Sequence, residues 1–287
     1  MKPAPFEYVR PAGLPEAVAA LAGEEGAKLI AGGQSLVPLM AMRLARPTLL
    51  VDTNDLGLDG IDASGAFVKI GASVRHRRLE RDPVIGRVAP LVQEAASLIG
   101  YPAIRTRGTI GGSLAHADPV AELPAVLVAG GGSVVVRGTG GVREIAAADL
   151  FTGFLETTLA HDEIVEEVRL PVAGPRTGSA FCEWAPREGD FAVAGIALTI
   201  ERDADGMCIA LGAAACGVGS VPLECSALLA SVLGATSSSG VLLREVGRTM
   251  RTGVGADDDQ ASLLALLAAR AVHRAFLRST TAGEAAA

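Results

Sequence analysis

The sequence predicts an α+β protein in two parts. Short apolar segments that are typical of strands alternate with helical patterns as far as residue 172. A Pro-Val-Ala-Gly-Pro segment at 171–175 has the composition of a linker, and beyond it three extended runs are followed by a helical remainder. We therefore expect a first domain at 1–175 and a second at 176–280, in which helices cover a three-stranded antiparallel sheet. We expect the tail at 281–287 to be disordered.

The elements of the first domain are marked by start and stop signals. The pattern at 14–22, for example, has proline and glutamate in its first turn and glycine after its last residue. The predicted helices are 14–22, a pattern through Leu36, Leu39, Met40, Arg43 and Leu44 that ends at Pro47, the basic stretch around 75–78, 91–99 and 122–129. The predicted strands are 28–31, 48–52, a hairpin of 60–62 and 67–72, 133–137 and 164–170. We interpret the basic stretch Arg75-His76-Arg77-Arg78 as a solvated face, with a contact to a partner subunit as the alternative.

The second domain begins with its strands. The extended runs lie at 179–186, 193–202 and 207–218, and Asp203-Ala204-Asp205-Gly206 joins the last two as a hairpin turn. Helical patterns follow near 224–233, 239–250 and 258–278.

Composition and charge exclude several classes of partner. The 287 residues carry a net charge of −7, and acids and bases are interspersed, so nothing indicates a nucleic acid or an anionic membrane as partner. Prolines and an acid occupy the start of the chain, where a secretory signal needs an apolar core, and no segment approaches 18 uninterrupted apolar residues. We expect a soluble, cytoplasmic protein without membrane insertion.

The cysteines do not indicate a metal centre. Cys182, Cys208, Cys216 and Cys225 have no C-x-x-C spacing and no histidine close by in the sequence. We interpret them as buried free thiols, and we expect neither an iron–sulfur cluster nor another metal site in this chain.

Two glycine loops are the strongest functional signal. The segment 105–119 holds Thr109, Gly111, Gly112 and Ser113, and the segment Ala31-Gly32-Gly33-Gln34-Ser35 follows a short apolar run. Glycines allow backbone N–H groups to approach a pyrophosphate closely. Either loop alone could be an ordinary connection between packed elements, but the two together suggest one long dinucleotide held at two places.

Three motifs in order carry a resemblance to a known family. A-G-G-Q-S-L at 31–36, T-I-G-G-S-L-A-H-A-D-P at 109–119 and E-G-D-F-A-V-A-G at 188–195 resemble those of the FAD-binding medium subunit of molybdenum hydroxylases, the carbon monoxide dehydrogenase and xanthine dehydrogenase-like enzymes. The resemblance covers essentially the whole chain. It implies that residues 1–175 form a two-subdomain FAD-binding domain of the PCMH type, with FAD bound noncovalently between the subdomains.

The resemblance also implies partners. In that family a large subunit carries molybdopterin and oxidises the substrate, a small subunit carries two two-iron two-sulfur clusters, and the flavin subunit passes the electrons to an external acceptor. This chain would be one subunit of a heterotrimer, which we expect to pair into a dimer of trimers.

The family pattern assigns a set of cofactor-binding residues. Asp190 and Phe191 match a segment that lies against the isoalloxazine ring, although a structural Asp-Phe pair is the alternative. Glu122 matches an acid that accepts a hydrogen bond from the cofactor, but an acid in a first helical turn is also favoured by the helix dipole. Where some members have a lysine before the third motif, this chain has Cys182-Glu183-Trp184. The residues assigned to FAD are Leu29, Ile30, Ala31, Gly32, Gly33, Gln34, Ser35, Leu36, Ile99, Thr109, Ile110, Gly111, Gly112, Ser113, His116, Asp118, Glu122, Val165, Asp190 and Phe191.

We assign no catalytic side chain, and we expect His116 to be a supporting loop residue that is hydrogen-bonded to backbone. The leading hypothesis is the FAD subunit of a molybdenum hydroxylase. The alternatives are a stand-alone FAD-dependent oxidase or dehydrogenase of the same fold and a non-enzymatic nucleotide-binding partner. Gln34, where some carbon monoxide dehydrogenases have histidine, favours an N-heteroaromatic or aldehyde substrate over carbon monoxide.

Overall fold

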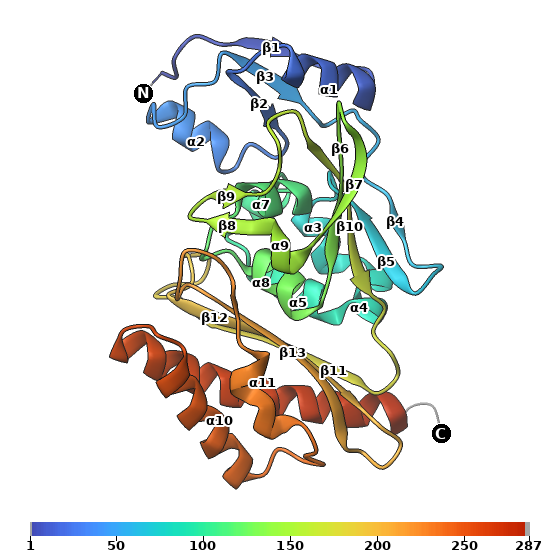
Figure 1. The fold of residues 1–287 in the computed structure, drawn as a ribbon, viewed down its shortest axis with the longest axis vertical. Coiled ribbons are helices and arrows are strands. Elements are labelled where there is room, and N and C mark those ends of the chain that lie inside the picture. The colour runs from blue at the N-terminus through green and yellow to red at the C-terminus, as the bar shows by residue number, and fades with distance from the viewer. Residues whose placement is uncertain (1, 285–287) are drawn as a thin grey trace.

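The computed structural model describes residues 2–284, and these residues form an elongated molecule of three stacked units (Figure 1). A three-stranded sheet lies at one end, a five-stranded sheet with helices lies in the middle, and a four-stranded sheet with two long helices lies at the other end. The α+β class predicted from the sequence is confirmed.

The N-terminal unit is a small parallel sheet. Its strands run in the order β1 (Glu7–Val9), β3 (Leu49–Asp52) and β2 (Ala27–Ile30). Helix α1 (Leu14–Ala22), which has the predicted bounds, buries Val18 and Leu21 in one core with Val51. Helix α2 (Leu36–Ala41) is shorter than the pattern that we expected to reach Pro47, because Arg43 adopts a left-handed conformation with φ of 59°.

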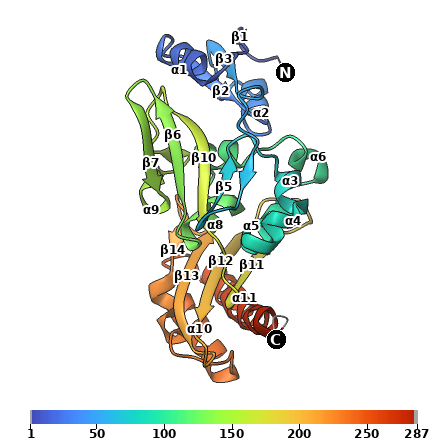
Figure 2. The same cartoon turned by 90° about the vertical axis from the view of Figure 1, so that its right-hand side faces the viewer.

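The middle unit is an antiparallel sheet with helices on one face (Figure 2). The strand order is β4 (Ile61–Asp62), β5 (Phe67–Gly71), β10 (Ile164–Pro171), β6 (Ser133–Gly138) and β7 (Gly141–Ala146). The helices are α3 (His76–Arg81), α4 (Pro83–Val88), α5 (Pro90–Leu98), α6 (Pro102–Arg105), α7 (Ile110–His116), α8 (Glu122–Ala129) and α9 (Ala147–Leu150). A two-stranded sheet of β8 (Phe151–Gly153) and β9 (Glu156–Thr157) completes the unit. The sequence did not predict β7, whose side chains are mostly exposed and show no apolar alternation.

The C-terminal unit has one more strand than we expected. The three predicted runs form β11 (Thr177–Trp184), β12 (Ala194–Arg202) and β13 (Cys208–Cys216), and the short strand β14 (Leu223–Glu224) pairs with β13. The segment η1 (Ser226–Val232) is a 3-10 helix, and α10 (Gly240–Gly253) and α11 (Asp258–Glu284) follow. Helix α11 includes the first four residues of the predicted disordered tail, and 285–287 lie outside the described residues.

The C-terminal sheet has a core on each face. Phe181, Ala197 and Cys216 on one face belong to the core of the middle unit, whereas Cys182 and Ile196 on the other face pack with residues of α10 and α11. This alternation follows from the two-residue period of a strand. The middle and C-terminal units therefore share a hydrophobic core.

The predicted thiols are buried: all four cysteines are unpaired and inaccessible. Within residues 2–284, no helix is long and apolar enough to cross a bilayer, and no group of three or more His, Cys, Asp and Glu side chains is arranged to hold a metal ion.

Candidate functional site

The two glycine loops are in contact, although one belongs to the N-terminal unit and the other to the middle unit. A methyl group on Gly32 would overlap the backbone of Arg107 and Gly108. A Cβ on Gly112 would lie 3.7 Å from that of Ala31. The two loops are therefore close enough for one ligand to contact both.

The first loop presents free backbone donors. Among the described residues, the N–H groups of Gly32, Gly33, Gln34 and Ser35 have no hydrogen-bond acceptor. Gly33 has a φ of +71°, which turns the backbone before α2, and the amide of Gln34 donates to the carbonyl of Gly32 at 3.0 Å. Successive free N–H groups in a turn form a concavity that binds anions.

The second loop differs from the sequence-based expectation. The N–H groups of Ile110 and Gly111 donate to the carbonyls of Val74 at 3.1 Å and Ala72 at 2.9 Å, and that of Gly112 donates to the hydroxyl of Thr109 at 3.1 Å. The expectation that the N–H groups of this glycine pair are free is therefore wrong.

These residues instead begin α7, with Thr109 as its N-cap. A Cβ on Gly111 would lie 2.5 Å from that of Ala72, so glycine is required there for helix packing. The half-buried side chain of Ser113 has no hydrogen-bond partner in the described part of the chain, so it is the group this loop can offer to a ligand.

A network of hydrogen bonds that we did not predict ties the loops together. Tyr8 donates to the carboxylate of Asp52, which accepts from the backbone N–H of Asn54 at 2.8 Å. The Asn54 amide donates to the carbonyl of Ala31 at 3.2 Å. Arg75 donates both to the side-chain oxygen of Asn54 and to the carbonyl of Arg107 in the second loop. The signal in the sequence was Asp-Thr-Asn at the end of a strand, a common polar turn.

The hydrogen bonds of this network keep Asp52 ionised. Burial raises the pKa of Asp52, but the hydrogen bonds from Tyr8 and Asn54 outweigh it and leave the pKa below its ordinary value. Asp52 therefore stays ionised and holds Asn54 in place.

The basic stretch is not simply a solvated face. Arg75 is engaged between the two loops, and His76 is 5% exposed with neither ring nitrogen hydrogen-bonded in the described structure. Burial lowers the pKa of His76 to about 4, so the ring is neutral. A Cβ on Gly108 would lie 2.7 Å from the Nδ1 atom of His76. The His76 ring therefore packs against the second loop.

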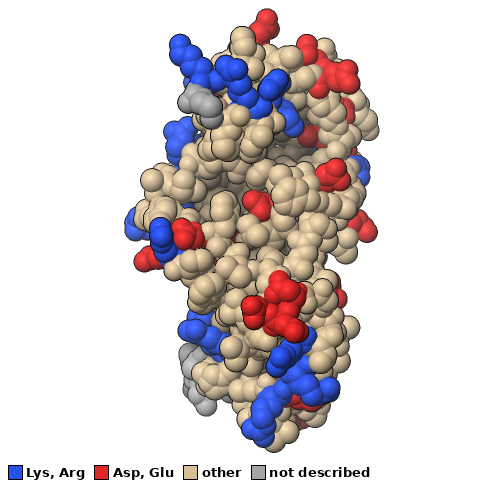
Figure 3. All heavy atoms as spheres, turned by 90° about the vertical axis from the view of Figure 1, so that its left-hand side faces the viewer, with Lys and Arg blue, Asp and Glu red and all other residues tan. Residues whose placement is uncertain are grey.

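A cleft of about 520 Å³ opens beside the first loop. The face that carries α2 is hollowed, and Lys and Arg side chains gather at its upper end (Figure 3). Basic side chains near an opening attract anionic ligands. The residues that line the cleft are Tyr8, Ile30, Ala31, Gly32, Gly33, Gln34, Val37, Pro38, Asp52, Asn54, Ile104 and Arg107.

The other predicted site residues lie around this junction or deeper in the middle unit. Leu29 and Ile30 end β2, Leu36 begins α2, and Ile99 follows α5. Val165 is buried in β10 next to a bulge. Asp118 accepts the N–H of Val120 at 3.1 Å.

His116 is the last residue of α7, and burial lowers its pKa. The hydrogen bond to backbone that we expected for it is absent from the described structure, because its ring reaches no polar atom within bonding distance.

The third motif lies in the loop between β11 and β12. Phe191 is 73% exposed, which excludes the alternative of a buried structural Asp-Phe pair. Gly189 has a φ of +83°, and a Cβ there would lie 2.8 Å from the ring of Tyr101. The N–H of Asp190 donates to the carbonyl of Arg187 at 3.1 Å. The loop therefore packs against the segment that leads into the second glycine loop.

Known proteins are similar to this chain over most of its length. A family model described as the FAD binding domain in molybdopterin dehydrogenase matches residues 4–173. The chain is 40% identical over 241 residues to the 6-hydroxypseudooxynicotine dehydrogenase complex subunit alpha of Paenarthrobacter nicotinovorans, covering 83% of this chain and 81% of the relative. It is also 40% identical over 234 residues to the caffeine dehydrogenase subunit beta of a Pseudomonas species, covering 79% and 78%.

A solved structure is similar over nearly the whole chain. Carbon monoxide dehydrogenase from Hydrogenophaga pseudoflava, in a form that lacks the Mo-pyranopterin moiety, superposes with a TM-score of 0.92 at 33% identity. The match covers 97% of this chain and 99% of that one.

Proposed function

Since this chain belongs to the family of FAD-binding domains of molybdopterin dehydrogenases, we propose that it is the FAD-binding electron-transfer subunit of a heteromeric molybdenum hydroxylase. The observation that carries the proposal is the first loop, whose N–H groups at Gly32–Ser35 have no acceptor in the described structure and whose Gly32 lies against the backbone of the second loop. A diphosphate needs several donors that converge on its oxygens. The residues present therefore fit the cofactor that the family implies.

The chain's own groups would divide the binding of FAD between them. Gly32 to Ser35 would hold the pyrophosphate with backbone N–H groups, and the hydroxyls of Ser35 and Ser113 would add donors. Because Ile110, Gly111 and Gly112 have their N–H groups engaged, their part is to fix α7 under the ligand. Ile99 and Val165 would bound the ring with apolar surface. When bound, FAD supplies electron transfer from the iron–sulfur clusters of a partner to an external acceptor.

The remaining predicted contacts complete this proposal. Leu29, Ile30, Ala31, Leu36 and Thr109 would shape the pocket from the two loops, and His116 and Asp118 would flank it from the end of α7. The exposed ring of Phe191 would lie beside the isoalloxazine, with Asp190 next to it in the same loop. In this layout the three-stranded and five-stranded sheets are the two subdomains of a PCMH-type domain at 1–175, and 176–280 is the second domain.

The partners follow from the family. A large subunit with molybdopterin and a small subunit with two-iron two-sulfur clusters complete the complex. We propose that the trimer dimerises in the cytoplasm and delivers electrons to an external acceptor. Relatives named for caffeine and a nicotine derivative support an N-heteroaromatic substrate, and Gln34 in the first loop agrees with this choice over carbon monoxide.

The addition of one methyl group at Gly32 tests whether the two loops bind FAD together. In Gly32→Ala, the new Cβ would overlap backbone atoms of the second loop, which cannot move aside as a flexible side chain could. Because the loops must separate, we expect the Kd for FAD to rise at least about tenfold. Gly140→Ala is the control, since a Cβ there meets nothing within 4 Å. Titration of the apoprotein with FAD, followed by flavin fluorescence, measures both.

Two results would contradict the proposal. The first is a wild-type chain that does not bind FAD. The second is an isolated, flavin-loaded chain that oxidises substrate without partners, which would indicate the stand-alone flavoenzyme instead.

A further inference from the structure

The cleft beside the first loop lies where two neighbouring parallel strands end. Strands β2 and β3 lie side by side (Figure 1), and the cleft is lined both by the loop that follows β2 and by Asp52 and Asn54 at the end of β3. Ligands of parallel sheets bind at the carboxyl ends of the strands. The free N–H groups of the first loop suit the anionic part of a ligand, but they leave the acid Asp52 without a role in binding.

Asp52 has an acceptor position to spare. Its Oδ1 atom accepts from the backbone N–H of Asn54 at 2.8 Å and from the Asn54 amide, and its Oδ2 atom accepts from Tyr8. A carboxylate accepts about four hydrogen bonds, two on each oxygen, and these contacts occupy three. Asp52 is 8% exposed and lines the cleft, so the remaining position on Oδ2 is open to a ligand in the cleft.

Tyr8 offers a second acceptor next to the first. Its hydroxyl proton points to Asp52, and this hydrogen bond raises the pKa of Tyr8, so the phenol keeps its proton. The phenol oxygen accepts no hydrogen bond from any described residue, and Tyr8 also lines the cleft. A hydroxyl group that donates to Asp52 leaves its oxygen free to accept in turn. Two adjacent acceptors therefore face the cleft.

These acceptors lie close to the free N–H groups of the first loop. The Asn54 amide donates to the Oδ1 atom of Asp52 and, at 3.2 Å, to the carbonyl of Ala31. That carbonyl belongs to the same peptide group as the free N–H of Gly32. A ligand group that reaches Asp52 is therefore attached only a few bonds away from the anion that the loop would bind.

The charge of Asp52 indicates what kind of group it accepts. An ionised carboxylate repels a neighbouring phosphate, and an amide could fill a purely structural place without that cost. A carboxylate forms stronger hydrogen bonds to hydroxyl donors than a neutral acceptor does. Within residues 2–284 it belongs to no group of three possible metal ligands. The chemistry favours an uncharged donor, such as a sugar hydroxyl.

We propose that Asp52 and Tyr8 recognise two neighbouring hydroxyl groups of a sugar that is attached to the bound diphosphate. This proposal rests on the proposed function. One hydroxyl donates to Oδ2 of Asp52, and the other donates to the phenol oxygen of Tyr8. FAD carries such hydroxyl groups on both sides of its diphosphate, on the ribose of the adenosine half and on the ribityl chain of the flavin half. Asp52 and Tyr8 are then specificity-determining residues for the cofactor.

The test compares FAD with three analogues. One lacks the two ribose hydroxyl groups, one lacks the ribityl hydroxyl groups, and one has hypoxanthine in place of adenine and so lacks the amino donor of the base. Titration of the full-length apoprotein, followed by flavin fluorescence, gives each Kd. For the wild type, we expect one of the two deoxy analogues to bind at least about tenfold more weakly than FAD, because the carboxylate loses its donor.

The variants Tyr8→Phe and Asp52→Asn show whether these residues contact the missing hydroxyl groups. In both, the ratio of the analogue Kd to the FAD Kd should fall towards one. A merely structural role would weaken FAD and the analogue equally and leave the ratio unchanged. Tyr8→Phe removes one oxygen from a side chain that is 53% exposed, so it tests the proposal even if Asp52→Asn does not fold. Asp55→Asn is the control and should keep the wild-type ratio, since Asp55 is exposed and does not line the cleft.

The outcomes separate this proposal from the proposed function. A ratio that falls for the ribose analogue assigns the site to the adenosine half, and one that falls for the ribityl analogue assigns it to the flavin half. If both variants keep the wild-type ratios, if neither deoxy analogue binds more weakly than FAD, or if only the hypoxanthine analogue does, the sugar contact is overturned and the FAD site stands. If the wild type binds neither FAD nor any analogue, the proposed function itself fails.

Discussion

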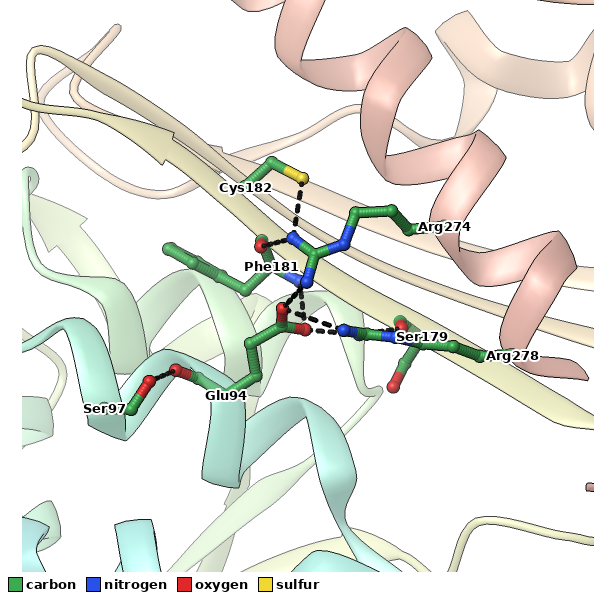
Figure 4. A network of polar contacts seen from close by, with 7 residues as sticks. All are labelled: Glu94, Ser97, Ser179, Phe181, Cys182, Arg274 and Arg278. Atoms are coloured by element: carbon green, nitrogen blue, oxygen red, sulfur yellow. Dashed lines mark hydrogen bonds and ion pairs between the residues drawn. The ribbon is translucent and has the colours of Figure 1, made fainter. Parts of the chain in front are cut away.

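Glu94 of α5 and Arg278 of α11 are 184 residues apart in the sequence, and their side chains meet at 2.6 Å (Figure 4). The same carboxylate pairs with Arg274 and accepts the backbone N–H of Phe181 at 3.0 Å. One half-buried acid therefore joins a helix of the middle unit to a strand and a helix of the C-terminal unit. Burial raises the pKa of Glu94, but the hydrogen bonds from Arg278 and Phe181 outweigh it, and the pKa lies below its ordinary value.

Removal of this carboxylate should destabilise the protein. In Glu94→Ala, the N–H of Phe181 loses its acceptor, and Arg274 and Arg278 lose their ion pairs with Glu94. We expect a loss of about 2 kcal/mol and a fall in Tm of roughly 5 °C, less than for a fully buried pair because Arg278 is partly exposed. Differential scanning calorimetry measures the change. The matched control is Glu245→Ala, which breaks an exposed pair with Arg248 and should leave the Tm unchanged. Equal shifts in the two variants would contradict the assignment.

The pH dependence of stability should reveal Glu122. Burial raises its folded pKa to about 8, so the stability contributed by its neutral form is fully present below its unfolded pKa of about 4.5 and is lost as the pH rises towards 8. Glu122→Gln removes this loss. We expect the variant to match the wild-type apoprotein near pH 4.5 and to exceed it by roughly 4–5 kcal/mol at pH 9, since each unit of pKa shift corresponds to about 1.4 kcal/mol. Urea unfolding at both pH values tests this, and a gain that is equal at the two values would count against a buried titrating acid.

The sequence predicted local features well where one segment sufficed. Leu14–Ala22 was recognised from its proline, glutamate and glycine, and the three long strands of the second domain from their apolar runs and a hairpin turn. The first glycine loop was recognised because its neighbours in the sequence, an apolar strand and a helical pattern, define it.

The features that the sequence did not reveal depend on distant segments. Gly111 was interpreted as a ligand contact, but its lack of a side chain is required by Ala72, which lies on another segment. The role of Asn54 depends on Arg75 and on the carbonyl of Ala31, and neither can be inferred from a single turn.

The network beneath the loops gives a third prediction. Asn54→Ala removes the donor to the carbonyl of Ala31 and the acceptor for Arg75, so the first loop loses its anchor to the second. Each such bond contributes about 1 kcal/mol, so we expect the affinity for FAD to fall roughly fivefold to thirtyfold. The control is Asp55→Asn, at the residue that follows Asn54. It alters an exposed ion pair with Arg10 and should have no effect on the affinity for FAD. An unchanged Kd in Asn54→Ala would show that the loops are held by packing alone.

The last prediction is that a substitution of Phe191 changes electron transfer but not the stability of the protein. Its side chain is 73% exposed, so Phe191→Asp should leave the Tm of the apoprotein unchanged. If the ring lies beside the bound flavin and limits its contact with solvent, a carboxylate there should slow electron delivery from the complex to the external acceptor. Reduction of the molybdenum centre by substrate occurs on another subunit and should be nearly unchanged. Rapid-mixing spectroscopy of the whole complex resolves the two steps.

A second exposed apolar side chain serves as the control for Phe191. Leu266 of α11 is 72% exposed, and Leu266→Asp introduces the same charge on a different element. A slower flavin step in Phe191→Asp but not in Leu266→Asp would assign the effect to the loop between β11 and β12. If the flavin step has the same rate in both variants, Phe191 does not lie at the flavin site. A slower molybdenum step in Phe191→Asp would contradict the separation of the two reactions between subunits.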